Sequence, residues 1–129
     1  MRDNASVTEL VDAYCAIWCE PDAAVRQRQL TAMWAQNGTY SDPTADSLNR
    51  DQLLAHIEKV LARRPGGRVL RTSAVDHHHR WAMFAWHVEL PDGATLTGSI
   101  DLLELDADGR IKTVVGFFGP LAIERPILK

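Results

Sequence analysis

The chain has 129 residues and a mass of 14.4 kDa, which is the size of one domain with its own core. Its formal net charge of −3 argues against nucleic acid as a partner, because phosphate binding requires clustered lysine and arginine. No apolar run approaches the roughly 18 residues of a membrane helix, and no export segment opens the chain. We therefore expect one soluble domain spanning residues 1–129, with no membrane partner and a cytoplasmic location.

The first half of the chain has the apolar spacing of three amphipathic helices. The first pattern follows Ser6, which we expect to be its cap, and the second ends at the stop signal Asn37-Gly38. Pro65 and the two glycines after it end the third. A short extended segment at residues 39–43 separates the second helix from the third. The expected helices span residues 7–18, about 22–36 and about 50–63.

After Gly67 the periodicity changes from helical to strand-like. Asp92-Gly93 and Asp108-Gly109 are hairpin signals, because glycine supplies the positive φ that tight turns require. Strands that follow one another across such turns form an antiparallel meander. We therefore expect an α+β fold in which the helices pack on one face of the sheet. The expected strands span residues 68–76, 80–90, 94–105 and 110–118.

The third expected strand has apolar residues on both faces. Counting by two places Ser99, Asp101 and Leu103 on one face, and Ile100 and Leu102 on the other. Helices can cover only one face of the sheet, so the other needs a different cover. A second subunit would provide it, and we therefore expect a homodimer.

The cysteines and histidines lack the pattern of a metal site. Cys15 and Cys19 are four residues apart in helical sequence, which favours two reduced thiols. Neighbours on a strand point to opposite faces, so at most His77 and His79 could share a metal ion. With no third and fourth ligand in sight, we expect no metal and no other cofactor. The histidine run is instead predicted to form a turn, with His78 or His79 reaching the mouth of a pocket.

Aromatic side chains concentrate on the inward positions of the expected helices and strands. Such residues are often only core, but here serine and aspartate share the inward face of the third strand. We therefore expect a mostly apolar pocket for a small hydrophobic molecule. His56, on the third helix, is expected to be a surface histidine or one whose hydrogen bonds are satisfied within the fold, rather than a catalyst. The residues expected to line the pocket are Trp18, Trp34, Tyr40, His79, Phe84, Trp86 and Phe118.

Five short motifs, taken in their order and spacing, resemble the SnoaL-like and ketosteroid isomerase-like branch of the nuclear transport factor 2 superfamily. The likeness covers nearly the whole chain. It implies a cone-shaped, usually dimeric α+β barrel with a curved antiparallel sheet, the N-terminal helices packed on its concave face and a pocket between them. The motifs are Tyr14–Trp18, Gly38–Pro43, Ile100-Asp101, Asp108–Ile111 and Gly116–Gly119.

Ketosteroid isomerases use a carboxylate base, a tyrosine and a neutral aspartic acid. The resemblance implies that Asp42 is the base and that Tyr14 and Asp101 donate hydrogen bonds to an enolate oxygen. We expect burial to keep Asp101 protonated while Asp42 stays ionised. The chain departs from the isomerase pattern at Trp34 and Ile57, which stand where those enzymes carry further tyrosines.

Several functions remain open at this point. The first is acid–base catalysis on a hydrophobic carbonyl compound, as an isomerase, cyclase or hydratase. The second is a binding module whose pocket holds an apolar ligand without chemistry. The others are an epoxide-opening enzyme and an accessory subunit on the same fold, because fold does not fix function. Convergence of Tyr14, Asp42 and Asp101 would favour catalysis, whereas Asp42 pointing to solvent would favour binding alone.

Overall fold

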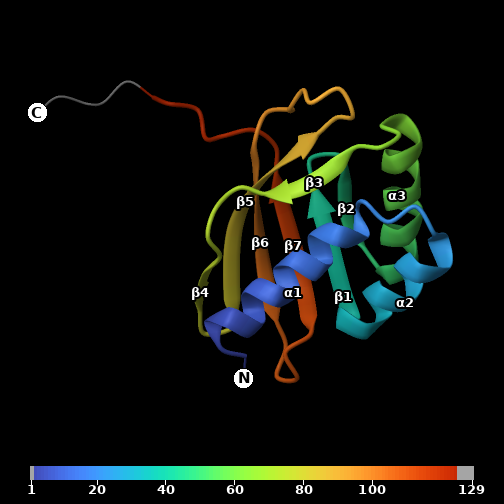
Figure 1. Cartoon of the computed structure of the whole chain (residues 1–129). Coiled ribbons are helices and arrows are strands. Elements are labelled where there is room, and N and C mark those ends of the chain that lie inside the picture. The colour runs from blue at the N-terminus through green and yellow to red at the C-terminus, as the bar shows by residue number, and fades with distance from the viewer. Residues whose placement is uncertain (1, 125–129) are drawn as a thin grey trace, which may run out of the picture.

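The computed structural model describes residues 2–124, in which three helices pack against a seven-stranded sheet (Figure 1). The helices are α1 (Asn4–Ile17), α2 (Ala23–Met33) and α3 (Arg50–Arg63). The strands are β1 (Trp34–Asp42), β2 (Ala45–Leu48), β3 (Arg68–Arg71), β4 (Asp76–His78), β5 (Trp81–Glu89), β6 (Ser99–Leu105) and β7 (Ile111–Phe117). Within this part of the chain, no helix is long and apolar enough to span a membrane.

Each helix begins at a side chain that accepts its free N–H groups. Asp3 Oδ1 accepts a hydrogen bond from the N–H of Ser6 at 2.8 Å, so Asp3 caps α1. The prediction that Ser6 is the cap is therefore wrong. Asp22 caps α2 in the same way. Asn49 and Gln52 form a capping box on α3, which begins and ends at the predicted residues.

The second predicted helix is too long. In the structure α2 ends at Met33 and Trp34 begins β1, so the predicted extended segment 39–43 covers only the end of this strand. The apolar spacing that suggested an inward-facing helical tryptophan is equally compatible with an inward-facing strand residue. Pairing decides between them, because Trp34 is the partner of Ile111 in β7.

The sheet is mixed and larger than the predicted four-stranded meander. Its strand order is β2-β1-β7-β6-β5-β3, with β4 paired to β5. The pairs β5–β6 and β6–β7 are antiparallel as predicted, but β1 runs parallel to β7. The first predicted strand is divided into β3 and β4, and between them Ser73 Oγ accepts the N–H of Ala85 at 2.8 Å. The third begins at Ser99, not at residue 94.

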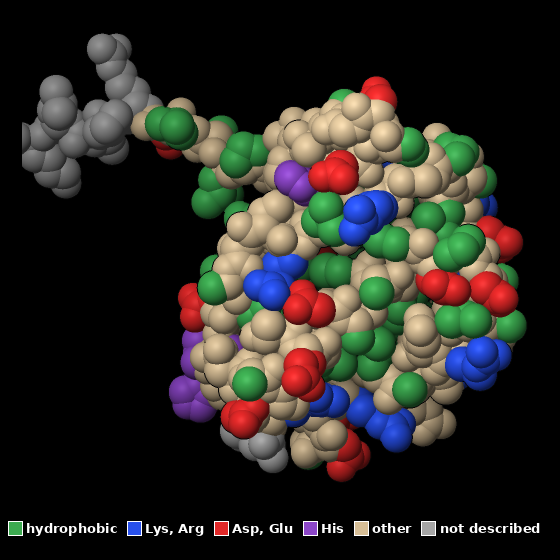
Figure 2. Space-filling model, viewed as in Figure 1, with side chains coloured by type: hydrophobic (Ala, Val, Ile, Leu, Met, Phe, Trp, Pro, Cys, Tyr) green, Lys and Arg blue, Asp and Glu red, His purple; other side chains and the backbone are tan. Residues whose placement is uncertain are grey.

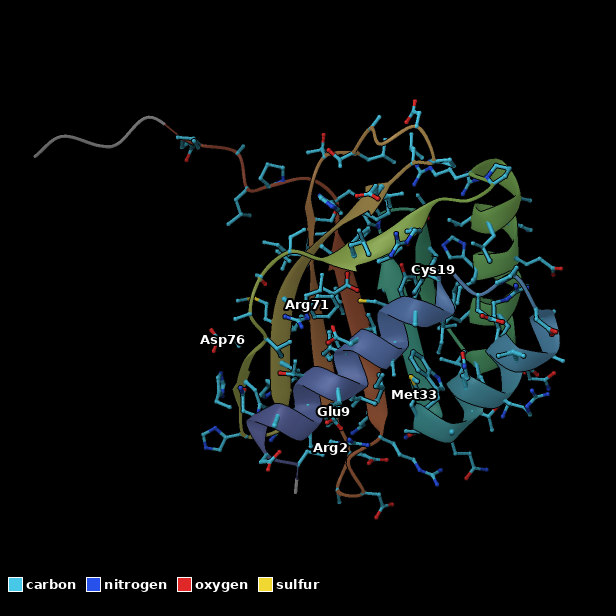
Figure 3. All side chains as sticks on the ribbon, in the orientation of Figure 1. Arg2, Glu9, Cys19, Met33, Arg71 and Asp76 are labelled. Carbon is cyan, nitrogen blue, oxygen red and sulfur yellow. The ribbon has the colours of Figure 1, made fainter. Side chains whose placement is uncertain are left out.

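The helices cover one face of this curved sheet. In Figure 1, α1 crosses in front of β5, β6 and β7, while α2 and α3 lie beside β1 and β2. The core between the layers contains fully buried residues of α1, such as Val7 and Val11, and of the sheet, such as Leu103 and Val114. Figure 3 shows Arg2 below the start of α1, where its Nε donates to the carbonyl oxygen of Gly109 at 2.7 Å.

The other face of the sheet exposes apolar side chains. Met83, Leu102 and Phe117 are large hydrophobic residues in contact with solvent, and Met83 and Leu102 are paired neighbours. After β7 the chain extends away from the sheet (Figure 1), with Leu121 and Ile123 almost fully exposed. The end of the predicted surface tail, residues 125–129, lies outside the described residues.

Candidate active site

Asp42 is the last residue of β1, and three donors hold its buried carboxylate. Tyr40 Oη donates to Oδ2 at 2.6 Å, and the N–H and Oγ1–H of Thr44 each donate to Oδ1 at 2.7 Å. The side chain of Asp42 is 2% exposed. Burial by itself would raise the pKa of Asp42, but the hydrogen bonds from Tyr40 and Thr44 outweigh it and place the pKa below its ordinary value. Asp42 is therefore an ionised acceptor at neutral pH.

An aromatic cluster surrounds this carboxylate. Trp18, at the end of α1, has its ring centroid 5.6 Å from that of Tyr40. His56 comes from α3, and its Nε2 lies 3.5 Å from Asp42 Oδ2. The cluster is built from three different elements, so the surroundings of Asp42 exist only in the folded protein.

Asp101 lies on β6 with its side chain toward the helices. It is 6% exposed, and Trp86 Nε1 donates to its Oδ1 at 2.9 Å. The pKa of Asp101 is raised to about 7, because burial and the negative charge of Asp42 raise it by more than the hydrogen bond from Trp86 lowers it. This is the predicted direction. At neutral pH a large share of Asp101 is a protonated carboxylic acid that can donate a hydrogen bond.

Gly116 lies between the two carboxyl groups. Asp101 pairs with Gly116 across β6 and β7, and Ser41 pairs with Val115, so Asp42 is the neighbour of Gly116 on the other side. A Cβ atom at position 116 would lie 2.7 Å from Asp101 Oδ1 and 3.7 Å from Asp42 Cβ. Only a residue without a side chain at this position therefore leaves room for the Asp101 carboxyl against β7, next to Asp42.

Tyr14 brings a free donor to the same region from α1. Its side chain is 1% exposed, and its hydroxyl has no hydrogen-bond partner within residues 2–124. Burial and the nearby charge of Asp101 raise the pKa of Tyr14 well above its ordinary value, and the approach of the Trp18 side chain to the hydroxyl lowers it only in part. The group thus remains a neutral O–H donor in need of an acceptor, which a bound oxygen atom would supply.

Comparison with solved structures shows which family shares this arrangement of elements. A candidate isomerase of the SnoaL-like family from Agrobacterium tumefaciens is 32% identical, with a TM-score of 0.80 over 84% of this chain and 93% of that one. The chain belongs to the SnoaL-like family. The predicted nuclear transport factor 2-like α+β fold is thereby confirmed.

Two more distant structures share the fold alone. A nuclear transport factor 2-like protein from Exiguobacterium has 14% identity and a TM-score of 0.66, over 83% of this chain and 95% of that one. A cystatin-fold protein from Novosphingobium aromaticivorans has 11% identity and a TM-score of 0.65, over 90% and 98%. No protein-family model and no curated protein matches the chain.

Most of the predicted site residues of this SnoaL-like chain lie near the two carboxyls. Phe84 is buried directly opposite Asp101 in the β5–β6 register, and the ring of Phe118 packs edge-on against Trp86 at 6.4 Å. Trp34 begins β1, and its buried indole lies against Gly38, four residues before Asp42. That Trp34, Phe84, Trp86 and Phe118 line one cavity stays a prediction.

His79 also lies away from the site. It is exposed in the turn between β4 and β5, at the opposite end of β5 from Trp86. Figure 2 shows histidine side chains, in purple, at the edge of the molecule over β4. His79 therefore does not reach Asp42, and the prediction that it borders the pocket is wrong. Within the described residues, no group of three or more histidine, cysteine or acidic side chains could hold a metal ion.

Two hollows of the described surface lie away from these carboxyls. One, of about 480 Å³, is bordered by Cys19 and Arg26, and another, of about 370 Å³, by Arg2 and Gly109. The candidate site of this SnoaL-like protein is therefore identified by its buried polar groups and not by an open pocket.

Three residues of the site were not predicted as such. His56 was interpreted as a histidine with satisfied hydrogen bonds or as a surface histidine. Its contact with Asp42 could not be predicted, because it depends on the packing of α3 against β1. Thr44 had a detectable signal, because an aspartate two residues before a threonine commonly accepts its backbone N–H. Gly116 had none, since its role depends on the register of β7 between β1 and β6.

Proposed function

We propose that this SnoaL-like protein is an enzyme that moves a proton on a small hydrophobic carbonyl compound, as an isomerase does. The observation that carries the proposal is a pair of buried carboxyl groups with opposite pKa shifts, Asp42 lowered and Asp101 raised to about 7, on either side of Gly116. Two carboxyl groups whose pKa values are shifted in opposite directions are typical of an acid and a base acting together. The relative from Agrobacterium, itself described as a candidate isomerase, supports the same reaction class.

Each group has a defined part in the proposed reaction. Asp42 takes a proton from the carbon next to the carbonyl group, and the electron pair moves onto the carbonyl oxygen. Tyr14 and the protonated Asp101 donate hydrogen bonds to that oxygen and stabilise its developing charge. Return of the proton from Asp42 to a different carbon completes an isomerisation. These steps need no group beyond the side chains and the substrate.

The pH dependence of the reaction follows from the two carboxyls. Asp101 must be protonated to donate, so the rate should fall as pH rises above about 7. Asp42 must be ionised to act as a base, so the rate should fall again in acid, below the ordinary pKa of aspartate.

The test uses an unsaturated ketone as substrate and a phenol as binding probe. Isomerisation of cyclohex-3-enone to the conjugated ketone is followed by its ultraviolet absorbance. Binding of 2-naphthol, whose oxygen resembles that of an enolate, is followed by fluorescence. Asp42→Asn should reduce turnover by about 10²–10⁴-fold and leave naphthol binding intact. Tyr14→Phe should weaken both, turnover by about 10²–10³-fold.

Asp51→Asn is the matched control, because Asp51 is an exposed carboxylate on α3 that is not in contact with the site. This variant should behave as wild type. Naphthol binding without any isomerisation by the wild type would contradict the proposal and favour a binding module, with a small apolar molecule as its ligand.

A further inference from the structure

His56 contacts the buried carboxylate of Asp42 and also reaches the surface. Its side chain is 16% exposed, against 2% for Asp42, and the two side chains approach to 3.5 Å between Nε2 and Oδ2. The imidazole lies edge-on to Trp18 at 6.0 Å and tilted to Tyr40 at 5.9 Å. The two aromatic rings thus hold the imidazole beside the carboxylate while part of it remains in water.

Among the described side chains in contact with Asp42, the imidazole of His56 is the one with a ring nitrogen that can accept a proton. Tyr40 and Thr44 both donate their hydroxyl hydrogens to the carboxylate. Burial raises the pKa of Tyr40 far above its ordinary value, so its hydroxyl keeps its proton. A proton that arrives on Asp42 therefore has two ways to leave, back to the substrate or onward to His56.

We propose that His56 takes the substrate-derived proton from Asp42 and exchanges it with water. The inference rests on the proposed function of Asp42 as a base. The substrate C–H bond breaks, its electron pair moves toward the carbonyl oxygen, and the proton forms an O–H bond on Asp42. This proton then passes to His56 Nε2, which gives an imidazolium ion and restores the carboxylate.

The imidazolium ion exchanges its N–H protons with solvent and returns one of them to Asp42, which transfers it to the new carbon. The product therefore carries a hydrogen from water in place of the one removed. The 3.5 Å separation is longer than a hydrogen bond, and a small rotation of the imidazole would close the difference. His56 acts on the substrate only through Asp42 and is a positioning residue.

Isotope content separates this route from direct return of the same proton by Asp42. Wild-type protein converts unlabelled cyclohex-3-enone in deuterium oxide, and deuterium at the γ carbon of the product is measured by NMR after subtraction of the uncatalysed exchange. Most product molecules should contain deuterium at that carbon. Retention of the original hydrogen by the wild type would overturn the relay and leave the proposed function standing.

His56→Gln provides the second measurement, because glutamine keeps the helix and a polar side chain but cannot carry the proton. Its product should lose most of the deuterium while turnover continues. Tyr40→Phe is the matched control, since it removes a hydrogen bond to Asp42 but keeps His56, and its product should contain as much deuterium as that of wild type.

Circular dichroism checks that both variants fold. If His56→Gln does not fold, the deuterium content of the wild-type product alone decides whether the relay operates. Unchanged deuterium in folded His56→Gln would overturn the relay. Absence of isomerisation by the wild type would overturn the proposed function and the relay together.

Discussion

Two regions of the same concave face differ sharply within a few residues of β6. Toward the end of the strand, Leu103 and Leu105 pack against Val114 and Ile111 in a fully apolar core. Two residues before Leu103, the same face carries Asp101 beside Gly116, with a carboxyl group in place of apolar packing.

Burial of side chains stabilises the folded protein in the apolar region, whereas it destabilises the folded protein in the polar region. A buried carboxyl and an unpartnered hydroxyl both cost stability, and a folded protein tolerates them only where the rest of the core compensates. Stability is therefore supplied at one end of the sheet, while the groups that can do chemistry are held at the other. Substitutions in the two regions should accordingly change stability in opposite directions.

The largest expected effect is a loss of stability in the apolar region. Leu103 is fully buried, so Leu103→Ala removes buried methyl groups and leaves a cavity. We expect the free energy of unfolding to fall by about 2–5 kcal/mol. Urea denaturation followed by circular dichroism measures it, with exposed Leu121→Ala as the control that should leave stability unchanged. A loss below this range would mean that the apolar end is not the main source of stability.

In the polar region, Asp101→Asn should stabilise the protein at high pH. Between the ordinary pKa of 3.8 and about 7, folded Asp101 keeps a proton that the unfolded chain has released, so wild-type stability falls as pH rises through this window. The shift of roughly three units corresponds to at most about 4 kcal/mol. Asparagine cannot ionise and keeps an acceptor for Trp86. The variant should match wild type near pH 4 and exceed it at pH 8.

Urea denaturation of both proteins at pH 4, 6 and 8 tests this difference. A stability gap that does not widen with pH would show that Asp101 titrates as an ordinary aspartate.

A smaller gain is expected from Tyr14→Phe. The Tyr14 hydroxyl is buried without a partner among the described residues, so its removal relieves a desolvation cost and leaves the ring in place. We expect an increase of about 1 kcal/mol in the free energy of unfolding. Thermal unfolding measures it, and a loss of stability would indicate that the hydroxyl has a bonding partner in solution, such as water.

The smallest effect on monomer stability concerns the opposite face of the sheet. Met83, Leu102 and Phe117 are exposed there, and we expect a second copy of the chain to cover them. Light scattering should give twice the 14.4 kDa chain mass for wild type and the chain mass for Leu102→Lys. The unfolding free energy of the monomer should change by no more than about 0.5 kcal/mol. A monomeric wild type would contradict the dimer.

Local sequence predicted the parts of the fold that depend on local interactions. The third helix was located to the residue, because its apolar spacing and its Pro-Gly-Gly terminator lie within the helix or next to it. The first strand was mostly missed, since Trp34 continues a helical apolar pattern and only pairing with distant Ile111 makes it extended. Composition and spacing carry no information about such pairing.

The candidate site shows the same limit. Tyr14, Asp42 and Asp101 were predicted from family resemblance. The opposite pKa shifts of the two buried aspartates arise because three hydrogen bonds hold the carboxylate of Asp42 and only one, from Trp86, reaches Asp101. His56 and Gly116 could not be predicted, because a helix packed on β1 and the register of three strands bring them to the carboxyls.

The parallel pairing of β1 with β7 also determines when the site forms during protein synthesis. Ser41 has Val115 as its partner, so β1 cannot join the sheet until nearly the whole described chain has left the ribosome. Contacts between such distant segments form slowly, because chain entropy is lost before the contact is made. Until then the carboxylate of Asp42 remains in water. The buried pair of aspartates is therefore completed only in the final steps of folding.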